Sequence, residues 1–337
     1  MMESLKEPKT VSVSAPSKLN LRLKVEGRDA NNYHLLSMLN VLTTLADELT
    51  LHFTPAEGIS LSVAGLSIPG EPTENLALCA AQQFFERFKV PGGVSIKLLK
   101  KIPIGSGLGG GSSDAAAVLR TCSKFLTDHL RAQVPLDVMK RELKSLALSL
   151  GADVPYLLQN SLARVTGIGE KVDCFDARFL EGIPVVIVVP SEPLPTKLVY
   201  DQYRSAHPSI AHTRDMKGEQ YGEMLRVNTA ARDYEPFPSR TIRTALWRQT
   251  VTQLSNDFED VVFEMLPSLR DIAFKLRALP EALCGMTGSG SAFFVLPRTL
   301  TAFDDGGILE VTKLLEKEKV NYFVEKLIGA VPAAKSS

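Results

Sequence analysis

The stretch from Lys101 to Leu119, KIPIGSGLGGGSSDAAAVL, constrains the fold more than any other part of the chain. Five glycines and three serines occupy the nine positions from Gly105 to Ser113. Before them, residues 93–104 alternate apolar and polar side chains as a half-buried strand does, and Pro103 ends that pattern. After them, a run of alanines favours a helix. The segment therefore predicts a strand, a glycine loop and a helix in succession.

A glycine loop in front of a helix has two interpretations. Its backbone amides and the positive end of the helix dipole can bind a phosphate, or the glycines can serve only a tight turn at a close packing contact. The strand before the loop and the helix after it favour phosphate. Ser112, Ser113 or Asp114 can cap the helix. No Gly-Lys-Ser/Thr follows, so this is no Walker A loop, and a Rossmann fingerprint would follow the first strand rather than lie about a hundred residues into the chain.

The bulk composition is that of a globular protein with two domains. A chain of 337 residues exceeds the usual size of a single core, and the apolar pattern breaks near residues 173–183. Because 38 Lys and Arg balance 38 Asp and Glu, no overall charge attracts nucleic acid or a membrane surface. No apolar run is long enough to span a membrane, and the first ten residues resemble no signal peptide, so we expect a cytoplasmic protein. The four cysteines are widely spaced and predict buried thiols rather than a metal site.

Strand and helix patterns alternate along the rest of the chain. Period-two alternation or an apolar run predicts strands at residues 9–25, 47–54, 183–190 and 291–297. Helical spacing predicts helices at residues 74–88, 135–151, 258–279 and 308–331. A polar stretch, residues 205–253, could pack as helices over the second half or serve as a lid.

Several stretches, in this order and spacing, resemble the GHMP kinase superfamily. They are APSKLNLRLKVEGR, NNYHLL, TENLALCAA, KKIPIGSGLGGGSSDAAAVL, LGADVPYLL, TGIGE, PTKLVY, NDFE and GMTGSGSAFFV. The resemblance implies an α+β, two-domain GHMP kinase fold. Residues 10–175 would form an ATP-binding domain like ribosomal protein S5 domain 2, and residues 176–337 a ferredoxin-like domain. The chain departs from the family pattern at Asn31-Asn32, where Asp-Gly usually precedes Tyr-His.

The resemblance implies that ATP and Mg²⁺ bind at the glycine loop. The implied phosphate-binding residues are Pro103, Ile104, Gly105, Ser106, Gly107, Leu108, Gly109, Gly110, Gly111, Ser112 and Ser113. For adenine the family pattern points to Asn75 and Lys100, although alone the first is typical of a helix cap and the second of a surface charge. Mg²⁺ bridges the phosphates in such kinases, and Ser113 is the candidate ligand on the protein.

Asp153 is the candidate general base. From the residues alone it could equally be a turn residue before Pro155, but the resemblance assigns it the proton of the attacking hydroxyl. Lys18 would lie beside Asp153 and stabilise negative charge on the reacting oxygen. The family pattern uses Asn20 to orient the substrate.

The acceptor implied by the closest branch of the superfamily carries a cytidine diphosphate group on methylerythritol, and its 2-hydroxyl would be phosphorylated in the non-mevalonate route to isoprenoids. The implied substrate-binding residues are Asn20, Tyr33, His34, Thr196, Tyr200, Gly288, Ser289 and Gly290. Two alternatives stay open: another small-molecule kinase acting on mevalonate or homoserine, and a non-catalytic binding module. The expected partners are small molecules, without nucleic acid or membrane, and the chain would act as a monomer or homodimer.

Overall fold

The computed structural model describes residues 5, 7–129, 134–159, 161–192, 194–208, 239–329 and 335–336. Its strands are β1 (Lys9–Arg28), β2 (His34–Thr54), β3 (Gly58–Gly65), β4 (Gly93–Lys100), β5 (Leu162–Gly167), β6 (Lys171–Phe175), β7 (Pro184–Val189), β8 (Ser255–Asn256), β9 (Ala282–Met286), β10 (Phe293–Pro297), β11 (Asn321–Ile328) and β12 (Lys335–Ser336). Its α-helices are α1 (Leu76–Phe88), α2 (Gly110–Asp128), α3 (Leu136–Leu150), α4 (Val154–Gln159), α5 (Thr196–Ala206), α7 (Arg240–Val251), α8 (Glu259–Met265), α9 (Pro267–Arg277) and α10 (Ile308–Glu318). Short helical turns lie at Pro72–Glu74, Arg178–Leu180 and Phe303–Gly307.

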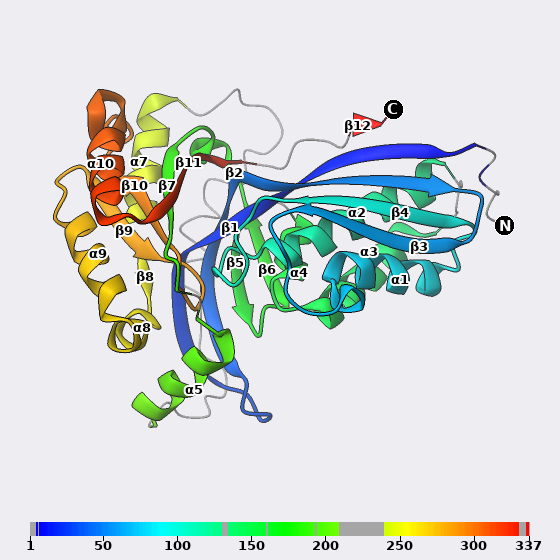
Figure 1. The fold of residues 1–337 in the computed structure, drawn as a ribbon, viewed down its shortest axis with the longest axis horizontal. Coiled ribbons are helices and arrows are strands. Elements are labelled where there is room, and N and C mark those ends of the chain that lie inside the picture. Colours follow the sequence, from blue (N-terminus) through cyan, green and yellow to red (C-terminus); the bar gives the residue numbers. More distant parts are fainter. Residues whose placement is uncertain are drawn as a thin grey trace.

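Two long antiparallel strands, β1 and β2, run through most of the molecule (Figure 1). Toward one end, β4 pairs with β2 and β3 pairs in parallel with β4, while β5 pairs with the other half of β2. Helices α1 to α4 gather beside these strands in the right half of Figure 1. The predicted strand, loop and helix are present as β4, residues 101–109 and α2, whose residues Ala115–Ala117 are buried and let the helix pack closely against β1.

The other half of the molecule is built on β7, β9, β10 and β11, with α7 to α10 beside them (Figure 1). The apolar run predicted at residues 183–190 forms β7, and it lies inside the sheet between β10 and β11. Strand β11 also pairs with β2 through Leu327 and Ile328, so one continuous path of strands joins the two halves. The expected boundary after residue 175 falls between β6 and β7 and stays a prediction.

Two of the predicted helices are wrong in part. The helix expected over residues 308–331 ends at Glu318, where Lys319 adopts a left-handed conformation with φ 57°, and the chain continues as β11. The helix expected over residues 258–279 is two helices, α8 and α9, separated at Leu266 because Pro267 cannot continue the first. Within the polar stretch, α5 ends at Ala206 and α7 begins at Arg240, and residues 209–238 lie outside the described part.

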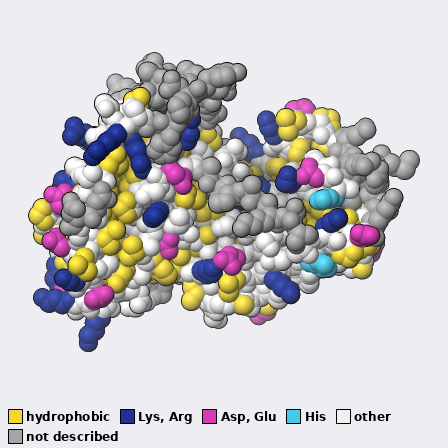
Figure 2. Space-filling model, turned by 90° about the horizontal axis from the view of Figure 1, so that it is seen from above, with side chains coloured by type: hydrophobic (Ala, Val, Ile, Leu, Met, Phe, Trp, Pro, Cys, Tyr) yellow, Lys and Arg dark blue, Asp and Glu magenta, His cyan; other side chains and the backbone are white. Residues whose placement is uncertain are grey.

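The prediction of buried cysteines holds for two of the four. All four are free thiols; Cys122 and Cys284 are buried, whereas Cys79 and Cys174 are half-buried. On the face seen in Figure 2, basic and acidic side chains are interspersed with apolar ones. None of the helices in the described ranges is long and apolar enough to cross a membrane.

Candidate active site

The glycine loop joins β4 to the N-terminus of α2. Gly105, Gly107 and Gly109 have φ of 68°, 79° and 71°, values that side chains with a Cβ rarely adopt. The predicted caps are wrong, because the helix already begins at Gly110 with Gly109 as its N-cap and no side-chain cap. Because no side chain caps α2, the first amides of this helix can face a ligand.

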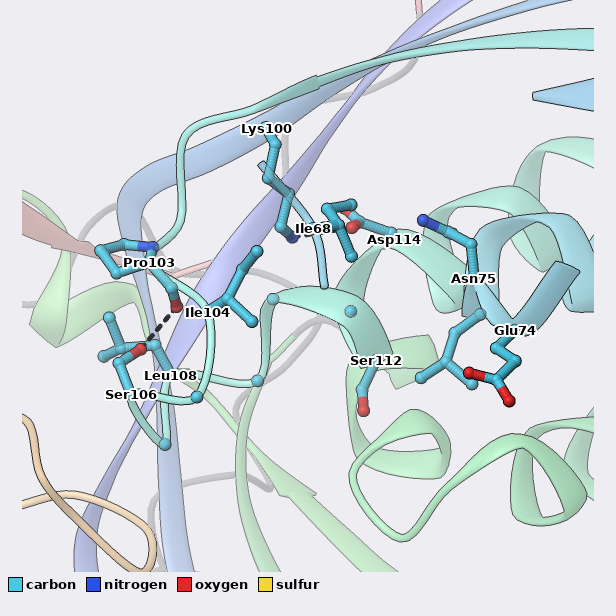
Figure 3. A pocket seen from close by; sticks show the side chains of 16 residues that line it. Ile68, Glu74, Asn75, Lys100, Pro103, Ile104, Ser106, Leu108, Ser112 and Asp114 are labelled. Atoms are coloured by element: carbon cyan, nitrogen blue, oxygen red, sulfur yellow. Dashed lines mark hydrogen bonds and ion pairs between the residues drawn. The ribbon is translucent and has the colours of Figure 1, made fainter. Parts of the chain in front are cut away.

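A cavity of about 340 Å³ lies over this loop. Its lining includes every predicted phosphate-binding residue from Pro103 to Ser112, together with Asn75 and Lys100. Ile68, Glu74, Leu76 and Asp114 complete the lining (Figure 3). Ser106 donates a hydrogen bond of 2.7 Å to the carbonyl of Pro103, which closes the turn at the entrance of the loop. The residues predicted from the glycine loop and those predicted for adenine therefore meet in one cavity.

Ser113, the candidate metal ligand, does not line this cavity. Its hydroxyl is buried and donates a hydrogen bond of 2.8 Å to the carbonyl of Pro16 on β1. The hydroxyl of Ser113 thus ties the first turn of α2 to β1, while the preceding Ser112 lines the cavity. In the described part of the chain no cluster of three or more His, Cys, Asp or Glu side chains could hold a metal ion.

Lys100 lies between two buried carboxylates. Its amine pairs with Asp47 and, at 2.8 Å, with Asp114, and all three side chains are almost fully buried. Asp47 also accepts hydrogen bonds from the amides of Lys101 and Ile102, at 2.6 and 2.8 Å. Burial raises the pKa of the Asp114 carboxyl to about 8; Lys100 opposes the rise and Asp47 adds to it. The triad joins the interior of β2 and the end of β4 to the first turns of α2, beside the cavity.

Asn75 has two roles in the structure. Its side-chain oxygen accepts a hydrogen bond of 2.9 Å from the amide of Ala77 and so caps α1, as the residue type alone suggests. Its side chain also lines the cavity beside Lys100 and Asp114 (Figure 3). The cap fixes the amide oxygen and leaves the amide NH₂ available to a ligand.

Lys18 and Asp153 lie together, as predicted. The Lys18 Nζ is 3.7 Å from the Asp153 Oδ2; the Lys18 side chain is buried, whereas Asp153 is 30% exposed and so accessible to a substrate. Asp153 stands in the turn just before α4, and Lys18 comes from β1. The amide of Lys18 donates a hydrogen bond of 3.0 Å to the carbonyl of Leu108, which places the pair directly beside the glycine loop.

Asn20 connects this pair to the second glycine loop, residues 287–291. Its side-chain oxygen accepts hydrogen bonds from the Lys18 amine at 2.5 Å, from the Gly288 amide at 2.8 Å and from the Thr287 hydroxyl at 3.3 Å. The two loops are in contact, because a Cβ on Gly288 would lie 3.0 Å from the Gly107 carbonyl oxygen. Ser289 reaches Thr196, at the start of α5, through a hydrogen bond of 3.0 Å between their hydroxyls.

His34 and Tyr200 form the other predicted cluster. Their rings lie 5.2 Å apart, and the Tyr200 ring also packs on Phe258 at 4.6 Å. His34 is buried, its Nε2 has no hydrogen-bond partner, and burial is the largest cause that lowers its pKa. Tyr33 is 64% exposed at the β1–β2 turn and makes no ring contact with any described residue. Asn32, where the family pattern has Gly, adopts φ 67°, a conformation that Asn tolerates better than most residues.

Comparisons with known proteins decide the family. A model of the GHMP kinases N terminal domain matches residues 75–159. The 4-diphosphocytidyl-2-C-methyl-D-erythritol kinase of Chlorobium phaeobacteroides is 34% identical over 85% of this chain and 88% of that protein. The enzyme of the same name from Thermus thermophilus is 36% identical over 84% of this chain and 86% of its own length. The chain belongs to this kinase family.

Solved structures support the family and the fold. A crystal structure of 4-(cytidine 5'-diphospho)-2C-methyl-D-erythritol kinase covers 95% of this kinase and 100% of its own chain, with a TM-score of 0.66 and 32% identity. Homoserine kinase from Cytophaga hutchinsonii covers 99% of both chains with a TM-score of 0.60, and at 15% identity this likeness shows the fold alone. The α+β GHMP kinase fold and the expectation of a kinase are confirmed.

Sequence reasoning missed three residues that organise the site of this kinase. Asp47 holds Lys100, Asn40 accepts a hydrogen bond of 2.7 Å from Asn20, and Thr287 joins Asn20 to the second loop. Asp47 and Asn40 stand inside a long apolar strand without any motif. The signal that could have found them is their polarity there, since a buried polar side chain needs a partner.

Proposed function

We propose that the chain transfers the γ-phosphate of ATP to the 2-hydroxyl of 4-diphosphocytidyl-2-C-methyl-D-erythritol, giving the 2-phosphate and ADP in non-mevalonate isoprenoid biosynthesis. The observation that carries the proposal is the Lys18–Asp153 pair, 3.7 Å apart, beside both glycine loops. The names of the relatives supply the acceptor. Phosphoryl transfer needs positioning and charge stabilisation more than covalent chemistry by the protein, and this site offers both.

Asp153 acts as the general base in this proposal. Its partly exposed carboxylate accepts the proton of the acceptor hydroxyl as the bond from oxygen to phosphorus forms. The Lys18 ammonium is held by the Asn20 side-chain oxygen at 2.5 Å and stabilises the negative charge that develops on the attacking oxygen. Asn20, Gly288, Ser289, Gly290 and Thr196 orient the alcohol.

The amides of the glycine loop and the N-terminus of α2 hold the ATP phosphates, and Asn75 and Lys100 lie where the nucleoside would extend along the cavity. The residues fit a Mg²⁺ that is held largely by phosphate oxygens and water, the usual mode for this ion. Ser112 lines the cavity, so its hydroxyl would supply a protein oxygen. The role of Ser113 as a metal ligand stays a prediction. In the structure its hydroxyl donates a hydrogen bond to the Pro16 carbonyl. When bound, the ion neutralises charge on the phosphates.

The cytosine end of the acceptor binds at His34 and Tyr200 in this proposal. A buried ring with an unpartnered Nε2 can bond to the polar edge of the base, and the Tyr200 ring offers a flat surface. Tyr33 is exposed beside His34 and can cover the other face of the base. A monomer or homodimer without nucleic-acid or membrane partners, and a cytoplasmic location, remain predictions.

The test is turnover of ATP, coupled to ADP detection, with the cytidine diphosphate substrate, mevalonate and homoserine in parallel. We expect turnover with the first substrate and none above background with the other two. Turnover of mevalonate or homoserine instead would transfer the assignment to another GHMP kinase. Binding of ATP without turnover of any of the three would favour the binding module.

A further inference from the structure

Asn40 is a polar side chain at an apolar place in β2. It is fully buried, and so are Met38 and Leu42, which lie two residues before and after it and therefore on the same face of the strand. On the β5 side of β2 it pairs with Ala163, which is buried as well. Stability of the fold alone would favour an apolar residue at this position.

The amide of Asn40 is only half satisfied. Its Oδ1 accepts a hydrogen bond of 2.7 Å from the Asn20 Nδ2, while its own Nδ2 is buried and has no partner among the residues that the structure describes. A buried donor without a partner costs free energy. Natural sequences keep such costly residues mainly where function requires them. The contact with Asn20 is therefore the feature to explain.

That contact bears on which way round the Asn20 amide lies. The Asn20 Nδ2 faces two acceptors, the Asn40 Oδ1 and, at 3.4 Å, the weakly accepting Met38 Sδ. The Asn20 Oδ1 faces donors, including the Lys18 amine at 2.5 Å and the Gly288 amide at 2.8 Å. Rotation of the amide by half a turn would place its NH₂ among donors and its oxygen against the Asn40 oxygen. Asn40 thus favours the orientation that serves Lys18.

The position of the Lys18 amine depends on Asn20 more than on Asp153. The Nζ lies at hydrogen-bond distance from the Asn20 Oδ1, whereas its distance to the Asp153 Oδ2 is 3.7 Å. An amine held by one close acceptor moves when that acceptor turns away. Hydrogen bonds therefore connect Asn40 to Asn20 and Asn20 to the amine beside Asp153.

We propose that Asn40 is a positioning residue of this kinase, which fixes the Asn20 amide so that its oxygen holds the Lys18 ammonium beside Asp153. The inference rests on the proposed function, in which Lys18 and Asp153 carry the phosphoryl transfer. Asn40 is fully buried and does not line the cavity over the glycine loop, so it acts through Asn20 rather than on a substrate.

The experiment compares Asn40→Leu and Asn40→Ala, which remove the acceptor, with Asn40→Asp, which keeps an oxygen facing Asn20. Thr250→Val on α7 is the matched control, because it also replaces a buried polar side chain by an apolar one of similar shape; the Thr250 hydroxyl bonds to the Leu246 carbonyl at 2.8 Å. Steady-state kinetics give kcat and both KM values, and denaturant unfolding gives the stability. Asn40→Leu is also combined with Lys18→Met.

We expect Asn40→Leu and Asn40→Ala to lower kcat by about tenfold and to leave the KM of ATP within about twofold, because the lysine is displaced while the ATP cavity is intact. Asn40→Asp should restore most of kcat, and Thr250→Val should leave kcat unchanged. The unfolding midpoint of Asn40→Leu should stay close to that of the wild type, since one unpaired amide group is removed and one is left at Asn20. In the Lys18→Met background, Asn40→Leu should change kcat by less than about twofold.

A second measurement needs no acceptor. Because a buried, hydrogen-bonded ammonium exchanges its protons slowly, Lys18 should give a nitrogen–proton NMR signal that is absent from Lys18→Met. We expect this signal to shift or disappear in Asn40→Leu and Asn40→Ala, and to persist in Asn40→Asp and Thr250→Val. If the wild type does not phosphorylate the cytidine diphosphate ester, the proposed function fails and this signal alone decides the role of Asn40.

Three results would overturn the proposal. The first is a wild-type kcat and an unchanged Lys18 signal in folded Asn40→Leu or Asn40→Ala. The second is a full tenfold effect of Asn40→Leu on kcat in the Lys18→Met background, which would mean that Asn40 does not act through the lysine. The third is a loss of kcat in Asn40→Asp as large as in Asn40→Leu, together with lower unfolding midpoints in both, which would make Asn40 a residue of the fold only. If Asn40→Leu does not fold, Asn40→Ala takes its place in each comparison.

Discussion

Gly105 and Gly109 offer a matched pair of substitutions that separates the strain of the glycine loop from its contact with the catalytic pair. Both have a left-handed backbone, with φ of 68° and 71°. A Cβ on Gly105 would meet nothing within 4 Å, whereas a Cβ on Gly109 would lie 2.9 Å from the Lys18 Cγ and 3.7 Å from the Asp153 Oδ2. Gly105→Ala and Gly109→Ala therefore share the backbone cost and differ in what the new methyl group touches.

The shared cost is the left-handed conformation of an alanine, about 1–2 kcal/mol of unfolding free energy in each variant. The additional effect in Gly109→Ala follows from the contact with Lys18. Ordinary contacts of this kind begin at 3.4 Å, so the lysine stem must move by about half an ångström, and its far end is held by Asn20. Because a misplacement of 1 Å near the reacting atoms can cost about 10²-fold in rate, we expect roughly a tenfold lower kcat for Gly109→Ala than for Gly105→Ala.

The assay combines denaturant unfolding of both variants with steady-state turnover at saturating ATP and acceptor. The expected result is similar stability in the two variants and the tenfold difference in kcat. Equal kcat at equal stability would refute the reasoning, because it would mean that Lys18 is not held where the geometry of the loop positions it. A larger loss of stability in Gly109→Ala would show that the new methyl group is accommodated by the backbone rather than by the lysine.

Three further predictions concern other parts of the site. Asp153→Asn should lower kcat by about 10²-fold or more, with both KM values nearly unchanged. In the double variant with Lys18→Met, kcat should fall by less than the product of the two single reductions. Near-normal kcat in folded Asp153→Asn would show that Asp153 is not the base. Tyr200→Ala should raise the KM of the acceptor by about ten- to a hundredfold and leave that of ATP unchanged, and an equal loss for ATP would contradict a base-binding role. Asp114, whose pKa is raised to about 8, keeps in the folded protein a proton that the unfolded chain releases near pH 4, so it lowers the unfolding free energy as pH rises from 4 to 8 by up to about 1.4 kcal/mol per unit. Asp114→Asn should flatten that slope in denaturant unfolding at pH 5, 6.5 and 8, and an unchanged slope would show that Asp114 ionises normally.

Local patterns predicted the parts of the site whose partners are close in sequence. The strand, glycine loop and helix of residues 93–128 follow from alternation, glycine content and alanine propensity, all of which act within a few residues. The contact between Lys18 and Asp153 did not follow from such patterns. It came from a resemblance, because the two residues are brought together by the packing of α4 on α2 and of α2 on β1.

The sequence predictions that were wrong or incomplete concern residues whose partners are far away in the chain. Residues 321–328 have apolar spacing that fits a helix as well as a strand, and their strand pairs with β7 and β2, which lie far away in the sequence. Asp47 gives no local signal because its role depends on Lys100, 53 residues further along the chain. A pattern within one segment cannot report a partner in another, so tertiary pairing decided both cases.

One side-chain oxygen makes the catalytic centre depend on both halves of the molecule. The Asn20 Oδ1 accepts from Lys18 of the first half and from Thr287 and Gly288 of the second, so the same oxygen contacts the catalytic lysine and the second glycine loop. Asn20 stands in the middle of β1, whereas the residues proposed for the cytosine lie at the β1–β2 turn and on α5. Substitutions at that turn and helix can therefore change which acceptor binds without moving the Lys18 amine. Substitutions at Asn20 or Thr287 are expected to affect both halves, because a shift of the Asn20 Oδ1 weakens its hydrogen bonds to Lys18 and to the second glycine loop together.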